Sequence, residues 1–336
     1  MTRIAVVGAT GNVGRVMLEV LRERRLDDDL VLFASPRSAG REIDGRPVHV
    51  LDDGADLTGI DIALFSAGAS TSRAWARRFA DAGAVVVDNS SAFRRDPEIP
   101  LVVAEVNPHA LRGHGGIIAN PNCSTMQLMV ALAPIHRAVG IERLVVSTYQ
   151  SVSGTGKAAL DELDAQTRAA IDGREAPEPS VYPDQIAFNV IGAAGSFPDG
   201  DDHTDEERKM MFETRKILED PEIGVAVTCV RVPVRVSHSE SVNVQTREPL
   251  SVERAVELLR DAPGVALGPP DVPPARWTPS PLQAAGRDEV FVGRLRRDES
   301  HPSALQMWVV SDNLRKGAAT NAVQIVELIS GDRVPV

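Results

Sequence analysis

The first third of the chain alternates two patterns of hydrophobic and polar positions. Short β-branched runs with few polar residues alternate with segments of helical periodicity. Apolar runs of this kind are typical of parallel strands buried on both faces, and the alternation predicts a doubly wound α/β domain. We expect strands at residues 3–7, 30–34, 61–66, 84–88 and 101–103, with helices at 12–25 and 70–82.

The pattern changes after residue 123 and predicts a second domain, of α+β type, with a mixed, largely antiparallel sheet. Its expected elements are helices at 126–139 and 157–172 and strands at 142–152, 226–237 and 240–246. Two segments rich in proline and glycine, 174–200 and 268–281, should be excursions, and the second suits a surface crossover.

The last predicted helix, at 314–329, carries an apolar stripe. Such a stripe must pack against other apolar surface, and we expect that surface to be the sheet of the first domain. The predicted boundaries are therefore 1–122 plus 313–336 for the first domain, and 123–312 for the second.

Composition narrows the classes of function. The 336 residues are 43% hydrophobic and 25% charged, enough for a substantial core, and the net charge is -11 without a basic block. We therefore expect small-molecule partners rather than nucleic acid. No long apolar run or signal-peptide pattern is present, which predicts a cytoplasmic protein without membrane segments. The two cysteines and seven histidines show no metal-binding spacing, so we expect no metal.

A glycine-rich stretch, "VVGATGNVG", joins the first strand to the first helix. Gly8, Gly11 and Gly14 let the backbone turn tightly and approach a diphosphate, whose charge then faces the free N–H groups of the helix terminus. This pattern predicts a Rossmann-like dinucleotide site. A tight turn without a ligand is the alternative.

The end of the second strand indicates which dinucleotide binds. A preference for NAD usually requires Asp or Glu there, to hold the ribose 2′-hydroxyl. The sequence instead offers Ser35, Arg37 and Ser38, which suit a 2′-phosphate. We therefore predict NADP. The alternative for Arg37 is an ordinary solvated loop arginine.

Cys123 stands in "NPNCSTMQL", between a proline turn and the start of a helix. The N–H groups and dipole of a helix N-terminus favour a thiolate and an oxyanion on a carbonyl under attack. A lone cysteine is more often apolar filler, and Cys229, inside an apolar strand pattern, fits that alternative. Cys123 does not, and we predict that it is a nucleophile.

A thiolate beside a nicotinamide indicates one reaction in particular. A thiohemiacetal can pass a hydride to the cofactor and leave a thioester, and in reverse an acyl phosphate is reduced to an aldehyde. Such a site also needs an acid/base, a phosphate pocket and a carboxylate clamp.

Several strings together resemble the bacterial aspartate-semialdehyde dehydrogenase family. They occur in the family's order over nearly the whole chain: "VVGATGNVG", "NSSAFR", "NPNCSTMQ", "TYQSVSGTG", "EERK", "CVRVPVRVSHSES" and "DNLRKGAATNAVQI". The resemblance implies NADPH-dependent reductive dephosphorylation of L-4-aspartyl phosphate to L-aspartate 4-semialdehyde. This reaction lies in the biosynthesis of lysine, threonine and methionine, including the diaminopimelate route.

The same resemblance implies roles for the catalytic residues. Cys123 would form the acyl thioester, His238 would be the acid/base and Gln150 would orient the substrate. Arg231 would clamp the α-carboxylate and Glu206 would face the α-ammonium group.

The resemblance also implies two further sets of binding residues. Arg94, Lys209 and Asn122 would hold phosphate. The NADP site would be lined by Gly8, Thr10, Gly11, Asn12, Val13, Gly14, Arg37, Ser38, Ser153, Gly154 and Asn313.

Each polar residue has an alternative. Glu206 and Lys209, three apart on a predicted helix, would also form a surface ion pair, and Arg94 would also suit a solvated loop. Arg231 and His238 lie an odd number of residues apart, so a regular strand would place them on opposite faces. We therefore expect a bulge or turn between them, near Pro233 or Ser237.

The nearest rival functions are reduction of N-acetylglutamyl phosphate or malonyl-CoA. Glu206 disfavours both, because neither substrate offers an ammonium group. The third alternative is a catalytically silent NADP-binding regulatory protein. We expect a homodimer through the second domain's sheet, as the resemblance implies, with a tetramer left open.

Overall fold

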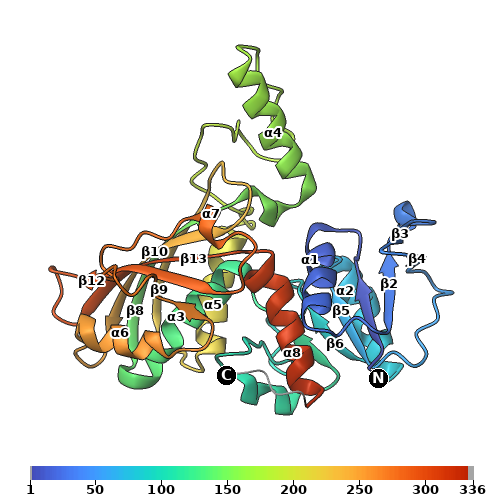
Figure 1. Cartoon of the computed structure of the whole chain (residues 1–336), viewed down its shortest axis with the longest axis horizontal. Helices are drawn as coiled ribbons and strands as arrows, with labels where there is room; N and C mark the ends of the chain where they lie inside the picture. Colours follow the sequence, from blue (N-terminus) through green and yellow to red (C-terminus); the bar gives the residue numbers. More distant parts are fainter. Residues whose placement is uncertain (1, 332–336) are drawn as a thin grey trace. The chain divides into compact units, whose positions relative to one another are not determined.

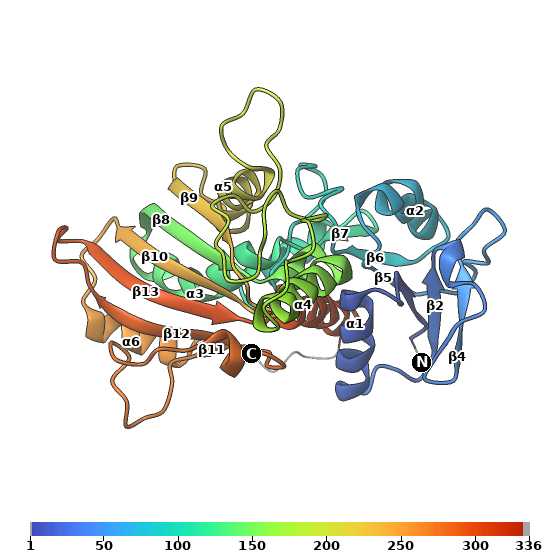
Figure 2. The same ribbon diagram turned by 90° about the horizontal axis from the view of Figure 1, so that it is seen from above.

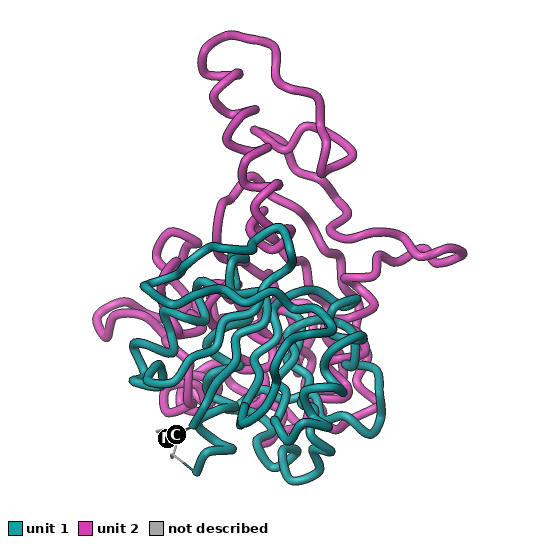
Figure 3. The backbone as a smooth tube through the Cα atoms, turned by 90° about the vertical axis from the view of Figure 1, so that its right-hand side faces the viewer, with its two compact units in different colours: residues 1–122, 318–336 teal, residues 123–317 magenta. Residues whose placement is uncertain are grey.

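The computed structural model describes residues 2–331, which form two compact units (Figure 3). Unit 1 comprises Met1–Asn122 and Ala318–Val336, and unit 2 comprises Cys123–Gly317. Residue 1 and residues 332–336, which belong to the predicted first domain, lie outside the described residues.

The described part of unit 1 contains a seven-stranded sheet in the order β3-β4-β2-β1-β5-β6-β7, parallel except for the β3–β4 pair (Figure 1). Its strands are β1 (Ile4–Val7), β2 (Leu30–Ala34), β3 (Glu42–Ile43), β4 (Arg46–Val50), β5 (Ile62–Phe65), β6 (Val85–Asp88) and β7 (Ile117–Ala119). β1, β5 and β7 are buried throughout, as the apolar runs predict for a sheet covered on both sides.

Three helices cover this sheet: α1 (Asn12–Glu23), α2 (Ala69–Asp81) and α8 (Asn321–Ile329). α1 packs against α8, and Val323 and Ile325 of α8 join the core that contains Ile4 and Met17. Phe79 of α2 stacks edge-on against Phe33 and Phe65 with centroid distances of 5.8 and 5.2 Å. The prediction that the last helix packs on the first sheet is confirmed.

Two predictions for unit 1 need correction. The strand expected at 101–103 is wrong, because only Leu101 forms an isolated bridge, to Ala119 of β7, before the chain turns. The helix expected at 314–329 is interrupted. Its first part is a π-helical segment, Arg315–Thr320, and regular α-helix begins at Asn321.

Unit 2, all of which is described, contains a six-stranded mixed sheet in the order β11-β12-β13-β10-β8-β9, with antiparallel pairing except at β11–β12 and β8–β9. Its strands are β8 (Ile141–Gln150), β9 (Gly224–Arg231), β10 (His238–Thr246), β11 (Val265–Ala266), β12 (Val290–Arg297) and β13 (Ala304–Ser311). The predicted fold class is confirmed.

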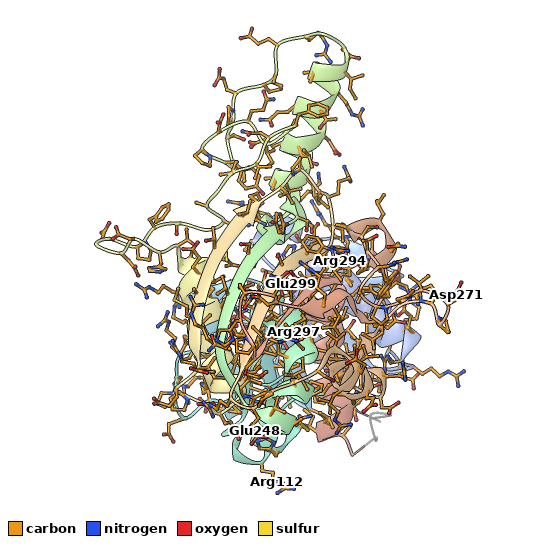
Figure 4. All side chains as sticks on the ribbon, turned by 90° about the vertical axis from the view of Figure 1, so that its left-hand side faces the viewer. Arg112, Glu248, Asp271, Arg294, Arg297 and Glu299 are labelled. Atoms are coloured by element: carbon orange, nitrogen blue, oxygen red, sulfur yellow. The ribbon has the colours of Figure 1, made fainter. Side chains whose placement is uncertain are left out.

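Helices α3 (Cys123–Val139), α5 (Asp205–Ile217) and α6 (Val252–Arg260) pack on one face of this sheet (Figures 1 and 2). α4 (Lys157–Ile171) and the irregular segment 174–200 form an excursion that extends away from the sheet (Figure 1). A second loop, 268–281, projects from unit 2 with exposed Asp271 near its tip, as expected of a surface crossover (Figure 4). It leads into the short helix α7 (Pro281–Ala284).

Candidate active site

One edge of the unit 2 sheet gathers three of the predicted site residues. β8 ends at Gln150, which is paired in parallel register with Arg231, the last residue of β9. β10 runs antiparallel to β8 and begins at His238, opposite Ser311 at the end of β13. Because these strand ends meet at one edge, residues distant in sequence converge there.

The regular strand is interrupted between Arg231 and His238, as expected from the odd number of residues that separates them. The strand expected at 226–237 is too long, because β9 ends at Arg231. The Val234 N–H donates to the Val232 carbonyl at 2.8 Å, a tight turn about Pro233, and Ser237 has φ of 77°. These two departures end one strand and reorient the chain before His238 begins the next.

The His238 imidazole is fully buried, and its two nitrogens differ. Nδ1 accepts a hydrogen bond from the Ser151 N–H at 3.0 Å and lies 3.1 Å from the Ser151 hydroxyl oxygen, whereas Nε2 has no hydrogen-bond partner within the described structure. Burial, reinforced by the charge of Arg231, lowers the pKa of His238 to about 3. The imidazole is therefore neutral at rest and carries its proton on Nε2.

The Arg231 guanidinium lies next to this histidine. Its Nη1 donates to the Ser151 carbonyl at 2.7 Å, and its Nε is buried without a partner among the described residues. A Cβ at Gly154 would lie 3.4 Å from His238 Nε2 and 3.7 Å from Arg231 Nη1. The Gly154 backbone therefore lies against both side chains, which is possible because it has no side chain of its own.

Asn313 forms hydrogen bonds with several residues at the same edge of the sheet. Its Oδ1 accepts from the Ser237 N–H at 2.8 Å and from the hydroxyls of Ser151 and Ser153 at 3.1 and 3.2 Å. Its side chain is thus occupied by the protein itself. The Gln150 Nε2, also buried, has no hydrogen-bond partner in the described structure and remains available to a ligand.

Cys123 is the first residue of α3 and is partly exposed. A Cβ at Gly317 would lie 2.8 Å from Cys123 Cβ and 3.6 Å from Asn313 Cβ, so Cys123 lies near the edge to which Asn313 and His238 belong. Cys229 differs. It is fully buried with its Sγ 3.7 Å from Met210 Sδ, and burial raises the pKa of its thiol, which makes it inert.

Helix α5 carries Glu206 and Lys209. Thr204 and Glu207 form a capping box at its N-terminus. Lys209 Nζ pairs with Asp205 at 2.6 Å and with Glu206 at 3.0 Å. Burial lowers the pKa of Lys209, but these two carboxylates outweigh it and the net pKa is raised. The local ion pair considered from the sequence therefore exists, and Asp205 takes part in it.

Two further observations concern the charged residues. The Glu206 charge raises the pKa of His238 against the larger effect of burial, so Glu206 lies within electrostatic range of the imidazole.

In unit 1, Arg94 is buried and its Nη2 donates to the Asn89 carbonyl at 2.7 Å, and Asn122 is buried directly before α3. Arg94 is thus held by the fold rather than solvated in a loop.

Unit 1 contains a pocket of about 380 Å³ at the carboxyl ends of β1, β2 and β5. Gly8 has φ of 91°, and a Cβ there would lie 2.9 Å from the Ser66 backbone, whereas a Cβ at Gly14 would lie 2.2 Å from the Gly8 carbonyl oxygen. Both positions therefore require glycine. The glycine turn opens the pocket and leads into α1, which is the arrangement that a dinucleotide diphosphate needs.

The rest of the pocket fits NADP better than NAD. Its lining contains no carboxylate: Val7, Gly8, Thr10, Gly11, Ala34, Ser35, Pro36, Leu51, Ser66, Ala67, Thr71 and Trp75. The Thr10 and Ser38 hydroxyls lie 3.2 Å apart, which joins the glycine turn to the loop after β2, and Arg37 on that loop is exposed. Asn12 Nδ2 is buried without a partner in the described structure, and Val13 follows it in the first turn of α1.

Sequence reasoning did not identify several residues of these sites. Ser151 and Ser237, which hold His238 and Asn313, stand in polar turns that resemble any other loop. Ser66 and Trp75 of the nucleotide pocket were also missed. Ser66 had a usable signal, because it directly follows a buried parallel strand, at the edge where ligands bind.

Comparison with known proteins first defines the class. The model of the semialdehyde dehydrogenase NAD-binding domain matches residues 3–114, and that of the semialdehyde dehydrogenase dimerisation domain matches residues 132–316. The protein is therefore an oxidoreductase of the semialdehyde dehydrogenase class, with a nicotinamide-dinucleotide-binding domain and a dimerisation domain. The closer relatives define it further: the chain belongs to the aspartate-semialdehyde dehydrogenase family.

Three relatives illustrate this membership. The aspartate-semialdehyde dehydrogenase of Aquifex aeolicus is 53% identical over 97% of both chains. The crystal structure of aspartate semialdehyde dehydrogenase II of Vibrio cholerae in complex with ASA matches with a TM-score of 0.92 and 49% identity over 99% of both chains. The enzyme of Candida albicans with NADP matches with a TM-score of 0.73 and 25% identity over 99% of both chains. Within residues 2–331, no helix is long and apolar enough to cross a membrane.

Proposed function

We propose that the protein catalyses the NADPH-dependent reductive dephosphorylation of L-4-aspartyl phosphate to L-aspartate 4-semialdehyde, and the reverse reaction. The observation that carries the proposal is the convergence of Gln150, Arg231 and His238 at one sheet edge, with Cys123 at the adjoining helix start. Membership of the aspartate-semialdehyde dehydrogenase family supports this substrate.

The chain supplies a nucleophile and a clamp. Cys123, as a thiolate at the start of α3, attacks the acyl carbon, and phosphate leaves as the thioester forms. The Arg231 donors not bound to Ser151 take the α-carboxylate, and Gln150 Nε2 orients the acyl group. Glu206 faces the α-ammonium group. Arg94, Lys209 and Asn122 hold the phosphate.

His238 acts as the general acid and base. Its Nε2–H is placed to donate to the acyl oxygen as negative charge develops there. Arg231 is one of the causes that lower the pKa of His238, so a substrate carboxylate bound to Arg231 raises the proton affinity of the imidazole. Protonation of Nδ1 replaces the hydrogen bond from the Ser151 N–H with one from Nδ1–H to the Ser151 hydroxyl, 3.1 Å away. Substrate binding thus prepares His238 for its role as acid and base.

We assign the cofactor site to the unit 1 pocket and to the turn that follows β8. Gly8, Thr10, Gly11, Asn12, Val13 and Gly14 receive the diphosphate, Arg37 and Ser38 the 2′-phosphate, and Ser153, Gly154 and Asn313 border the nicotinamide. When bound, NADP(H) carries the hydride equivalents of the reaction. We assign residues 1–122 with 313–336 to the NADP domain and 123–312 to the catalytic and dimerisation domain, although residues 313–317 belong to compact unit 2.

One assay tests the proposal. Wild type is given L-aspartate semialdehyde, NADP and phosphate, and nicotinamide reduction is followed in parallel with a Cys123→Ala variant. We expect turnover by wild type and none by the variant. An inactive wild type would end the proposed function, and an active variant would end the thioester mechanism. N-acetylglutamate semialdehyde with phosphate, and malonate semialdehyde with coenzyme A in place of phosphate, should give no comparable turnover.

We infer a homodimer that pairs through the sheet face opposite α3. That face presents Val145, 37% exposed, and the ring pair Tyr149–Trp308, with centroids 5.3 Å apart. Burial of such apolar surface against a second copy is favourable. A tetramer of two dimers is the open alternative, and size-exclusion chromatography with light scattering distinguishes the dimer from the tetramer.

We place the enzyme in the cytoplasm, in the biosynthesis of lysine, threonine and methionine.

A further inference from the structure

The excursion 174–200 lies along the substrate side of unit 2 rather than apart from it. Ile191 and Arg231 form an antiparallel bridge, with Ile191 N–H to Arg231 carbonyl at 3.0 Å and the reciprocal bond at 2.9 Å. The Ala194 N–H donates to the Cys229 carbonyl at 2.7 Å. The excursion therefore continues the sheet beyond β9, next to the residue assigned to the substrate carboxylate.

Its far end contacts the helix that carries Glu206. The Ser196 N–H donates to Asp205 Oδ1 at 2.7 Å. Gly195 has φ of 93°, and a Cβ there would lie 2.4 Å from Asp205 Oδ1 and 3.2 Å from Glu206 Cβ. One segment thus contacts the elements that carry both charged groups assigned to the substrate.

Tyr182 is the side chain of this segment that reaches Arg231. The guanidinium carbon lies 5.9 Å from the centroid of the Tyr182 ring, within range of a cation–π interaction. The Tyr182 hydroxyl donates to Thr155 Oγ1 at 3.0 Å, in the turn that also contains Ser153 and Gly154. The Tyr182 ring therefore faces the Arg231 guanidinium, and the Tyr182 hydroxyl is bonded to the turn that contains Gly154.

The backbone around Tyr182 is firmly anchored. Glu162 Oε2 accepts from the Ser180 N–H, the Ser180 hydroxyl and the Val181 N–H, at 2.7, 2.7 and 2.8 Å. Val181 and Tyr182 pack on the small core that contains Val152. Since the two residues that precede Tyr182 are fixed and its ring packs on this core, Tyr182 presents a preorganised surface.

We propose that Tyr182 is a positioning residue that sets the affinity for the substrate carboxylate. The ring faces the guanidinium, the Gly154 backbone lies against Nη1, and the Ser151 carbonyl accepts a hydrogen bond from Nη1. The donors that remain, Nε among them, are thereby directed at the ligand. This inference rests on the proposed function, in which Arg231 binds that carboxylate.

The test compares Tyr182→Leu, Tyr182→Phe and Phe188→Leu with wild type. Phe188 belongs to the same excursion but is 71% exposed, so its replacement controls for general disturbance of the segment. We expect Tyr182→Leu to raise KM for L-aspartate semialdehyde about tenfold with kcat within about twofold, Tyr182→Phe to raise it about threefold, and Phe188→Leu to leave it unchanged.

Two further readouts separate positioning from loss of structure. KM for inorganic phosphate should not change, because Tyr182 contacts Arg231, which is assigned to the carboxylate and not to the phosphate. The kcat/KM for butanal, an aldehyde without a carboxylate, should be the same in wild type and Tyr182→Leu. An unchanged KM for L-aspartate semialdehyde in Tyr182→Leu would overturn the proposal. So would a parallel rise of both KM values or an equal loss with butanal. A wild type inactive on L-aspartate semialdehyde would refute the proposed function instead.

Discussion

The backbone N–H of Ser151 donates a hydrogen bond to Nδ1 of His238 at 3.0 Å. A backbone N–H can only donate, so Nδ1 must present its lone pair, and the proton of the neutral ring lies on Nε2, towards Gly154. The orientation of the acid/base is therefore set by a main-chain group at the end of β8. No side-chain substitution at residue 151 removes this bond, except one to proline.

The neutral His238 makes the fold sensitive to acid. Its folded pKa of about 3 lies below the ordinary histidine value of 6.5, so the unfolded chain binds more protons between these pH values. The stabilisation is present above pH 6.5 and is lost as the pH falls, by up to roughly 1.4 kcal/mol per pH unit. Urea unfolding from pH 7 to 5 should show a shallower loss for His238→Asn than for wild type. His109→Asn, at an exposed position, should behave like wild type.

Glu240 should have the opposite effect. It is fully buried in β10, and burial raises its pKa well above 4.5 despite the opposing influence of the Gln127 amide. The stability from its protonated form is present below pH 4.5 and is lost as the pH rises. Glu240→Gln, neutral throughout, should gain stability over wild type between pH 5 and 8, by up to about 1.4 kcal/mol per pH unit in thermal or urea unfolding.

Glu162 provides a matched control for that experiment. Burial raises its pKa, but the bonds from Ser180 and Val181 outweigh burial and the net pKa is lowered. The carboxylate therefore stabilises the fold above its unfolded pKa, and Glu162→Gln should lose stability at pH 7. A gain in both variants would contradict the assignment for Glu240.

The two cysteines should differ in reactivity. Iodoacetamide should label Cys123, which is partly exposed, and spare Cys229, which is buried with a raised thiol pKa. Mass spectrometry of the native protein should find a single label, absent in Cys123→Ala and reduced when substrate is present. Labelling of Cys229 at a similar rate would contradict the burial described above.

Gly317→Ala should impair catalysis although Gly317 takes no part in the chemical steps. The new methyl group would lie 2.8 Å from Cys123 Cβ, so one of the two must shift. Because small displacements of a nucleophile are costly, kcat should fall about 10- to 100-fold. Gly113→Ala, where a Cβ meets nothing within 4 Å, is the matched control and should keep wild-type activity.

Arg37→Asp should reverse the cofactor preference. Replacing the cation with an anion repels a 2′-phosphate and provides an acceptor for a ribose 2′-hydroxyl. KM for NADP should rise about tenfold or more and KM for NAD should fall. Arg112→Asp, an exposed arginine elsewhere in unit 1, should change neither value (Figure 4). An unchanged ratio of the KM values for NADP and NAD in Arg37→Asp would contradict the assignment of Arg37 to the 2′-phosphate.

Periodicity predicted the strands of unit 1 well where both faces are buried. β2 runs from Leu30 to Ala34 as expected, and β1, β5 and β6 differ by one or two residues at their ends. It failed at residues 101–103, which are apolar enough for a strand but turn away after one bridge. Burial alone does not make a strand, since pairing depends on where the chain goes next.

The candidate site shows a similar limit. The motifs singled out Cys123, Gln150, Arg231 and His238, and parity alone predicted a break between the last two. The supporting groups could not be predicted, because Ser151 acts through its main chain and Tyr182 lies in a segment without periodicity. The π-helical segment before the last helix contains Gly317, which closely approaches Cys123, and local pattern does not encode such a tertiary contact.

The bridge between Ile191 and Arg231 also affects assembly. β9 is the last strand at its side of the six-stranded sheet, and an open strand there would template the addition of another chain. The reciprocal bonds of Ile191, together with the bond from Ala194 to Cys229, occupy main-chain groups that such an addition would need. The opposite border is the two-residue β11, too short to guide further pairing. Growth into a continuous intermolecular sheet is thereby blocked at both borders, and self-association is directed to flat surfaces that close by two-fold symmetry.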